Sequence, residues 1–291
     1  MTQLFGRSVD VVVGNKRLTG LDCAFEIEKS LLPEPNKCSL KIYNLAEDTR
    51  AHFEELAPRQ RWQTKGIPVR IEAGYGDDRA ILWIGELRNV VTEIDGPDWV
   101  TSMDSGDGYL AYQNSRVNLS FGPMTPVATV LQALVAKLGA GVGNVAAALA
   151  TLKVNGVGML YPSGIVLSGS VAQELTDFCR SAGLEWSIQD GVLQILDRGQ
   201  ASRGQALLLS SDTGMVGSPS VDVDGILSVK TLLIPDVRVG SILVVNSERV
   251  KGTYRLEKAT WSCDTSGDDW HITMQARRYP PRFEGPSNPG A

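Results

Sequence analysis

Residues 1–105 alternate between apolar and polar positions in short runs, and this period of two is typical of half-buried β-strands. Turn-forming residues separate the runs, as in Gly14-Asn15 and Asp95-Gly96-Pro97. A further turn, from Gly74 to Asp78, links two of the runs into a predicted hairpin. The pattern predicts strands over residues 9–13, 18–28, 38–43, 67–73, 80–91 and 99–103.

One helix is predicted to interrupt these strands. Asn44 is a suitable N-cap, and Glu47 follows three residues later as in a capping box. Leu45, Phe53 and Leu56 then recur at helical spacing. We therefore expect an amphipathic helix that covers part of the sheet.

Helical periodicity concentrates in the middle of the chain. Thr125 is a predicted N-cap with Pro126 at the first helical position, and apolar residues repeat from there until Gly139. A second helix is predicted to begin at Ser170, with Gln173 completing a capping box, and to end at Gly183. The segment that follows predicts a hairpin over 184–188 and 192–196, around the turn Gln189-Asp190-Gly191.

The last part of the chain returns to strand patterns, and charge density supports a division into three. Residues 1–105 carry 13 basic and 17 acidic side chains, residues 106–204 carry 6 and 6, and residues 205–291 carry 9 and 10. We predict a β-rich domain over 1–105, a mixed α/β middle domain over 106–204, a second β-rich domain over 205–278, and a C-terminal tail over 279–291. The strands predicted in the last β-rich domain cover residues 227–233, 241–245, 250–263 and 270–277.

Composition narrows the class of protein. A net charge of −5 over 291 residues argues against non-specific nucleic-acid binding, and two histidines make a histidine-built metal centre unpromising. The N-terminus has no signal-peptide pattern and no apolar run of 18 residues occurs, so we expect synthesis in a cytoplasm without membrane insertion. The four cysteines form no C-x-x-C pair, and we expect reduced, buried thiols; a Cys23–Cys38 bridge is the alternative.

Two motifs suggest ligand binding but lack its context. Residues 141–146 match the relaxed dinucleotide fingerprint G-x-G-x-x-A, yet a helix precedes them and no acidic residue follows at the required interval of about 20 residues. Asp104 and Asp107 suggest a calcium loop, but the oxygen ligands at alternating positions are missing. We interpret both as turns, and we expect no cofactor or metal.

Catalytic constellations are equally unsupported. Neither His52 nor His271 is predicted beside a nucleophile, and no G-x-S-x-G elbow surrounds a serine. A glycosidase needs two carboxylates, but the adjacent pairs Glu54-Glu55 and Asp268-Asp269 are predicted as solvated positions. The basic cluster at 277–282 favours a solvated tail over a docking segment. We expect no enzymatic activity and name no catalytic residue.

Several segments of the sequence resemble phage tail baseplate hub proteins of the late control protein D family. They follow one another over about 80% of the chain: Tyr43-Asn44-Leu45, residues 69–76 with 81–87, residues 184–195 with 209–219, and residues 232–235 with 240–256. In the second segment a strand runs into Ala73-Gly74-Tyr75, and an apolar strand closes on a Gly-x-Leu pattern. The order and spacing of these segments carry the resemblance.

The resemblance implies a mainly β (α+β) fold in which two β-barrel-like domains of similar fold flank the mixed helical middle region. It implies a structural virion protein of the tail baseplate, assembled in the bacterial host cytoplasm. Three chains would form a homotrimeric ring whose six barrels give pseudo-six-fold symmetry. This ring would join the tail tube protein to the central spike protein, with tape measure and baseplate wedge proteins as further candidate partners.

Two alternatives from other classes stay open. One is a carboxylate-based cell-wall hydrolase of the tail, which requires a paired carboxylate set in a cleft. The other is a carbohydrate-binding β module, which requires an exposed aromatic platform. The sequence shows no appended lysozyme-like or peptidoglycan-cleaving module, so the resemblance to hub proteins implies no lytic activity.

Overall fold

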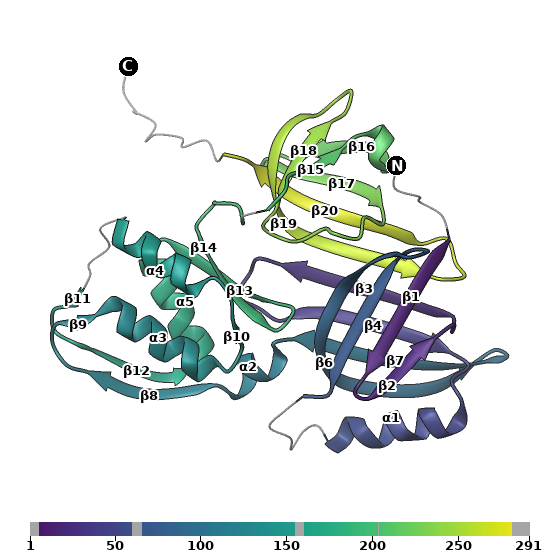
Figure 1. Cartoon of the computed structure of the whole chain (residues 1–291), viewed down its shortest axis with the longest axis horizontal. Coiled ribbons are helices and arrows are strands. Elements are labelled where there is room, and N and C mark those ends of the chain that lie inside the picture. Colours follow the sequence, from purple (N-terminus) through teal and green to yellow (C-terminus); the bar gives the residue numbers. More distant parts are fainter. Residues whose placement is uncertain (1–5, 60–65, 155–159, 203, 281–291) are drawn as a thin grey trace.

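Antiparallel strands dominate the structure, a computed structural model that describes residues 6–59, 66–154, 160–202 and 204–280. Figure 1 shows the sheet strands on the right and at the top, with most of the helices gathered on the left beside them. The elements up to Asp107 are β1 (Arg7–Val13), β2 (Lys16–Thr19), β3 (Cys23–Ser30), β4 (Asn36–Tyr43), α1 (Glu47–Arg59), β5 (Pro68–Tyr75), β6 (Asp78–Asp95) and β7 (Asp98–Asp107).

The middle of the chain mixes short strands with helices. Its elements are α2 (Tyr109–Asn114), β8 (Arg116–Phe121), β9 (Thr125–Pro126), α3 (Val127–Leu138), β10 (Gly141–Val142), α4 (Val145–Val154), β11 (Leu160–Tyr161), β12 (Ile165–Ser170), α5 (Val171–Ser181), β13 (Leu184–Gln189) and β14 (Val192–Asp197).

The C-terminal part is again made of strands. Its elements are β15 (Leu207–Leu209), the short 3-10 helix η2 (Ser211–Thr213), β16 (Met215–Val221), β17 (Ile226–Leu232), β18 (Ile242–Asn246), β19 (Lys251–Asp264) and β20 (Trp270–Arg278). No helix in the described ranges is both long and apolar enough to cross a membrane.

One sheet of 13 strands joins the N-terminal and C-terminal parts. Its order is β16-β17-β20-β19-β3-β4-β7-β6-β5-β1-β2, with β18 paired to β19 and β15 paired to β18. Strand β19 makes the connection, because residues 251–255 pair with β18 and residues 258–264 then pair with β3. The predicted pair of separate β-barrel-like domains needs correction here: the described pairings follow one open path and close no barrel.

The buried hydrophobic residues form two clusters, one in the large sheet and one in the middle of the chain. Strands of the N-terminal and C-terminal parts bury one shared cluster, whose largest members include Trp83, Trp261 and Phe53. The helices α3 and α5 bury a second cluster against β8, β12, β13 and β14, built around Leu131, Leu134 and Leu175. The chain between α2 and β14 therefore packs as a unit on its own core.

Most of the predicted strands and helices form, and three local expectations are wrong. The strand predicted over 18–28 breaks after Thr19, where Gly20 has a φ of +68°. Asn44 does not cap the helix; its side chain accepts the Trp99 main-chain N–H and donates to Asp98. Thr125 lies in β9 and donates to the Gly122 carbonyl oxygen, so α3 begins at Val127.

The second capping box is also absent. Ser170 is the N-cap residue of α5 but makes no side-chain capping hydrogen bond, and Gln173 donates to Asp177 on the exposed face. The four cysteines are free and buried, as expected. Most of the predicted C-terminal tail lies outside the described residues, which end at Pro280.

Candidate functional site

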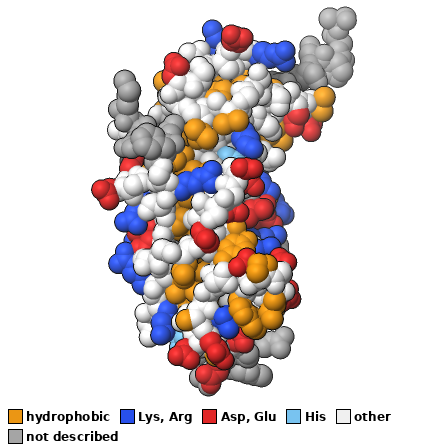
Figure 2. All heavy atoms as spheres, turned by 90° about the vertical axis from the view of Figure 1, so that its right-hand side faces the viewer, with side chains coloured by type: hydrophobic (Ala, Val, Ile, Leu, Met, Phe, Trp, Pro, Cys, Tyr) orange, Lys and Arg blue, Asp and Glu red, His pale blue; other side chains and the backbone are white. Residues whose placement is uncertain are grey.

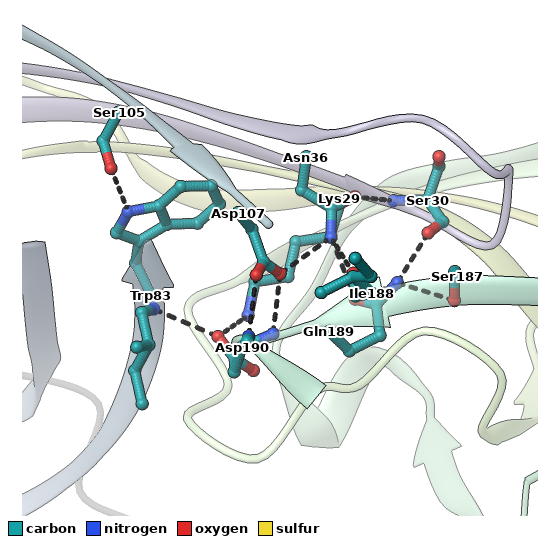
Figure 3. A network of polar contacts seen from close by, with 12 residues as sticks. Lys29, Ser30, Asn36, Trp83, Ser105, Asp107, Ser187, Ile188, Gln189 and Asp190 are labelled. Atoms are coloured by element: carbon teal, nitrogen blue, oxygen red, sulfur yellow. Dashed lines mark hydrogen bonds and ion pairs between the residues drawn. The ribbon is translucent and has the colours of Figure 1, made fainter. Parts of the chain in front are cut away.

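A polar network joins the β13–β14 hairpin to the large sheet (Figure 3). The turn of this hairpin is tight: Asp190 has a φ of 54° and Gly191 a φ of +79°, a combination that Asp and Gly tolerate. The turn meets the end of β7 and the strands β3 and β6. We call this network the junction; it comprises Lys29, Asn36, Asp107, Gln189 and Asp190.

Asp107 anchors the turn by its main chain. One carboxylate oxygen accepts the Asp190 N–H at 2.6 Å and the other accepts the Gly191 N–H at 2.7 Å. The side chain is fully buried, and burial raises the pKa of Asp107 to about 7, although the two N–H donors and Lys29 oppose the shift. Asp107 therefore holds the hairpin in place and titrates close to neutral pH.

Lys29 provides the charge that balances the junction. Its Nζ lies 2.6 Å from Asp190 Oδ1, and the same oxygen accepts the Ile84 main-chain N–H at 3.1 Å. The ammonium group also lies 5.8 Å from the ring centre of Trp83 and 6.0 Å from that of Trp261. A buried lysine is costly without a partner, and Asp190 is the acidic side chain that pairs with Lys29.

Two amide side chains complete the junction. Asn36 accepts the Ser30 N–H at 2.9 Å and donates to the Ile188 carbonyl oxygen at 2.9 Å. Gln189 donates to the Ser30 carbonyl oxygen at 2.7 Å. The Ile188 and Gln189 contacts link β13 to β4 and β3, so the amide side chains help to hold the hairpin against the sheet.

Arg255 makes a second connection between the same two parts of the molecule. This buried guanidinium pairs with Glu185 of β13, with Glu257 at 3.0 Å, and with the Gln200 carbonyl oxygen at 2.9 Å. Burial lowers the pKa of Arg255, but its hydrogen bonds and charge interactions with Glu185 and Glu257 together raise it above the usual value. Because β19 carries Arg255 and β13 carries Glu185, the pair ties the C-terminal strands to the middle of the chain.

Two hollows border these joints. A cavity of about 490 Å³ lies between β6, the β13–β14 hairpin and residues 235–239, and Lys29, Ile81 and Arg238 contribute to its lining. A groove of about 450 Å³ lies on the polar face of the sheet, where Glu26, Glu28 and Asp104 face Lys37 and Arg88. Acidic and basic side chains line both hollows.

The Gly-rich motif at 141–146 serves packing. The helix α3 precedes the motif, as expected, and the two-residue strand β10 lies within the motif itself. A Cβ at Gly143 would lie 2.4 Å from the Leu193 carbonyl oxygen, so the glycine permits close approach to β14. Asn144 then bonds the main chain of Ile195. The space beside Gly143, where a dinucleotide would need to approach, is filled by strand β14.

The two histidines and the two adjacent acidic pairs considered as catalytic candidates do not belong to the junction. His52 contacts the ring of Phe53 on α1, and His271 pairs with Asp269 at 3.4 Å while burial lowers its pKa. Glu54-Glu55 and Asp268-Asp269 are exposed and line neither hollow. In the described ranges, no group of three or more His, Cys, Asp or Glu side chains could hold a metal ion.

Sequence reasoning treated Asp107 and Asp190 as ordinary turn residues and so missed the junction. Each does sit at a turn, but their partners lie 71 or more residues away. The available signal was Lys29, an isolated charge in a strand whose neighbours on the same face, Ile27 and Leu31, are apolar. A lysine buried at such a position needs an acidic partner to offset the loss of hydration.

Two ion pairs with a buried cation, Lys29–Asp190 and Arg255–Glu185, join the middle of the chain to the sheet, and acidic and basic side chains line the two hollows beside them. A family model described as baseplate hub gp41 matches residues 8–276. The chain therefore belongs to the baseplate hub family, and its class is that of phage tail proteins. No protein in the curated set matches the chain.

Solved structures share the fold at low identity. A tail protein from Neisseria meningitidis MC58 superposes with a TM-score of 0.63 at 13% identity, covering 94% of this chain and 97% of that one. The 43 kDa tail protein of prophage MuSo2 from Shewanella oneidensis gives 0.63 at 12%, covering 94% and 98%. The E. coli c3393 protein, a component of the type VI secretion system, gives 0.55 at 12%, covering 92% and 76%.

Proposed function

We propose that the protein is the hub of a tail baseplate, a homotrimeric ring that joins the tail tube protein to the central spike protein. Membership of the baseplate hub family is the observation that carries this proposal. In this arrangement residues 1–105 and 205–278 act as two equivalent β-rich domains. Three chains then present six similar surfaces toward the tube and three toward the spike.

The open sheet supports the proposal in a form that differs from two closed barrels. Strands β3 and β19 fuse the two β-rich parts into one continuous sheet, so their relative orientation is fixed by main-chain hydrogen bonds. A ring that must match six tube subunits needs this constancy within each chain. We propose that residues 106–204 form a middle domain held to the sheet by the junction and by Arg255.

The hub family is structural, and we propose that the chain has no catalytic activity. We also propose assembly in the bacterial host cytoplasm, with tape measure and baseplate wedge proteins as further neighbours. Deleting the coding sequence from the phage tests the assignment. We expect particles without a joined tube and spike, restored by expression of the chain in trans; tails that assemble normally without it would contradict the hub role.

A further inference from the structure

Strand β19 carries an extra residue at the point where it changes partners. Its pairing with β20 skips Glu257, because Leu256 and Lys258 lie opposite two consecutive residues of β20. This is a β-bulge, with Glu257 as the additional residue. Before the bulge, residues 251–255 pair with β18; after it, residues 258–264 pair with β3. In Figure 1 β18 lies among the C-terminal strands at the top and β3 lies below them, so the bulge marks the passage from one β-rich part to the other.

The bulge keeps both halves of β19 turned toward the same core. Before it, the buried apolar side chains are the even-numbered Tyr254 and Leu256. After it, they are the odd-numbered Ala259, Trp261 and Cys263. All five belong to the hydrophobic cluster that the two β-rich parts share. Side chains alternate strictly along a strand, so without the extra residue one half of β19 would turn its apolar side chains to the opposite face.

The Glu257 side chain holds the bulge from both strands. One carboxylate oxygen accepts a hydrogen bond from Arg255 Nη2 at 3.0 Å, and the other accepts one from Arg277 Nε of β20 at 3.0 Å. The Glu257 carbonyl oxygen accepts the Leu31 main-chain N–H, just beyond β3, at 3.0 Å. Arg255 also pairs with Glu185 of β13. Contacts to both β-rich parts therefore meet at Glu257, and Arg255 extends them to the middle of the chain.

We propose that Glu257 is a positioning residue, which fixes the angle between the β-rich parts 1–105 and 205–278. The extra residue bends β19 and increases its local twist. The charge-assisted hydrogen bonds from Arg255 and Arg277 then hold this bend in one geometry. Figure 2 shows an elongated molecule with the C-terminal strands above the N-terminal sheet, so a change in the bend would move its two ends relative to each other.

The consequence for assembly rests on the proposed hub function. Three chains can match six tube subunits only when the angle between the two β-rich parts is the same in every chain. A chain with a loosened bend would still fold around its core but would present its six surfaces to the tube in unequal orientations. Glu257 would then matter for the assembly of the tail as well as for the fold.

Distances between two spin labels test the bend on the full-length chain. The labels are placed on Ile94→Cys in the N-terminal part, which is 65% exposed, and on Val223→Cys between β16 and β17, which is fully exposed. The four native cysteines are buried, so the engineered thiols take most of the label. In an excess of unlabelled chain we expect one narrow distance distribution. Glu257→Ala should shift this distribution or broaden it about twofold, because the bulge loses the carboxylate that holds it.

Three further variants make the result specific. Arg277→Ala removes one exposed partner of Glu257 and should change the distribution in the same direction as Glu257→Ala, whereas Glu257→Gln keeps an acceptor oxygen and should stay closer to wild type. The matched control Glu28→Ala breaks an exposed ion pair with Lys258, next to the bulge, and should leave the distribution unchanged. An unchanged distribution in both Glu257→Ala and Arg277→Ala, or an equal change in Glu28→Ala, would overturn the inference.

Deletion of Glu257 tests the bulge itself. The deletion should lower the melting temperature further than Glu257→Ala does, or prevent folding, because half of β19 would turn its apolar side chains away from the core. A deletion variant that melts like Glu257→Ala would contradict the role of the extra residue.

The label distances are independent of the hub function. Tails that assemble normally without the chain would refute the hub function and leave the bend standing, whereas unchanged distances would refute the bend and leave the hub function standing. When both hold, phage carrying Glu257→Ala should form fewer tails with a joined tube and spike than phage carrying Glu28→Ala. Equal numbers would contradict the consequence for assembly.

Discussion

The main-chain N–H of Asp190 donates to the Asp107 carboxylate at 2.6 Å across 83 residues of sequence. This hydrogen bond brings the β13–β14 turn to the end of β7, and Lys29 meets the same turn from β3. Three distant segments therefore depend on one buried network. The stability of the connection between the middle of the chain and the sheet should be sensitive to each of its charges.

Asp190→Asn should destabilise the protein by about 1–3 kcal/mol. The substitution keeps a side chain that tolerates a φ of 54° and can still accept the Ile84 N–H, but it removes the charge opposite Lys29. Chemical denaturation measures the change. The control is Asp177→Asn, which breaks an exposed pair with Arg180 and should cost less than about 0.5 kcal/mol. Equal effects would contradict the importance of the junction.

Asp107 should make stability fall as pH rises from about 4 to about 7. Its folded-state pKa of about 7 exceeds the ordinary value of about 3.9, so the folded protein binds more protons in this window. Asp107→Asn should flatten this part of the pH–stability curve, although it also leaves one buried N–H without an acceptor. A variant with the wild-type slope would show that another group is responsible.

Gly85→Val and Gly74→Val should both lower the melting temperature, and for a similar reason. A Cβ at Gly85 would lie 2.6 Å from the buried Trp83 ring, and one at Gly74 would lie 2.0 Å from the Asp78 carbonyl oxygen. Gly74 is thus needed for close main-chain approach and not for a left-handed φ. The control Gly122→Val, which meets nothing within 4 Å, should melt close to wild type.

Glu185→Gln should weaken the second connection. Arg255 is buried and would keep Glu257 and the Gln200 carbonyl oxygen, but its partner on β13 would lose the negative charge. We expect faster hydrogen exchange in β13, a part of the middle unit, with β3 and β4 unchanged. Uniform exchange across the chain would show that Glu185 does not couple these parts.

The sequence patterns predicted the strands well where alternation was regular, as in β1, β4 and β17. They failed where tertiary contacts override local preference: Asn44 binds the Trp99 main chain in place of capping α1. Strand β16 escaped prediction because its exposed edge, with Gly217 and Pro219, lacks an alternating pattern. The junction was hidden for a different reason, since nothing local in Asp107 or Asp190 indicates partners 71 or more residues away.

The hub assignment is tested most directly by an electron-microscopic reconstruction of the tail end of the assembled particle. We expect three copies of the chain in one ring between tube and spike, with the β-rich residues 1–105 and 205–278 occupying six similar positions toward the tube. Six copies per ring, or a position away from the tube–spike boundary, would contradict the proposed function.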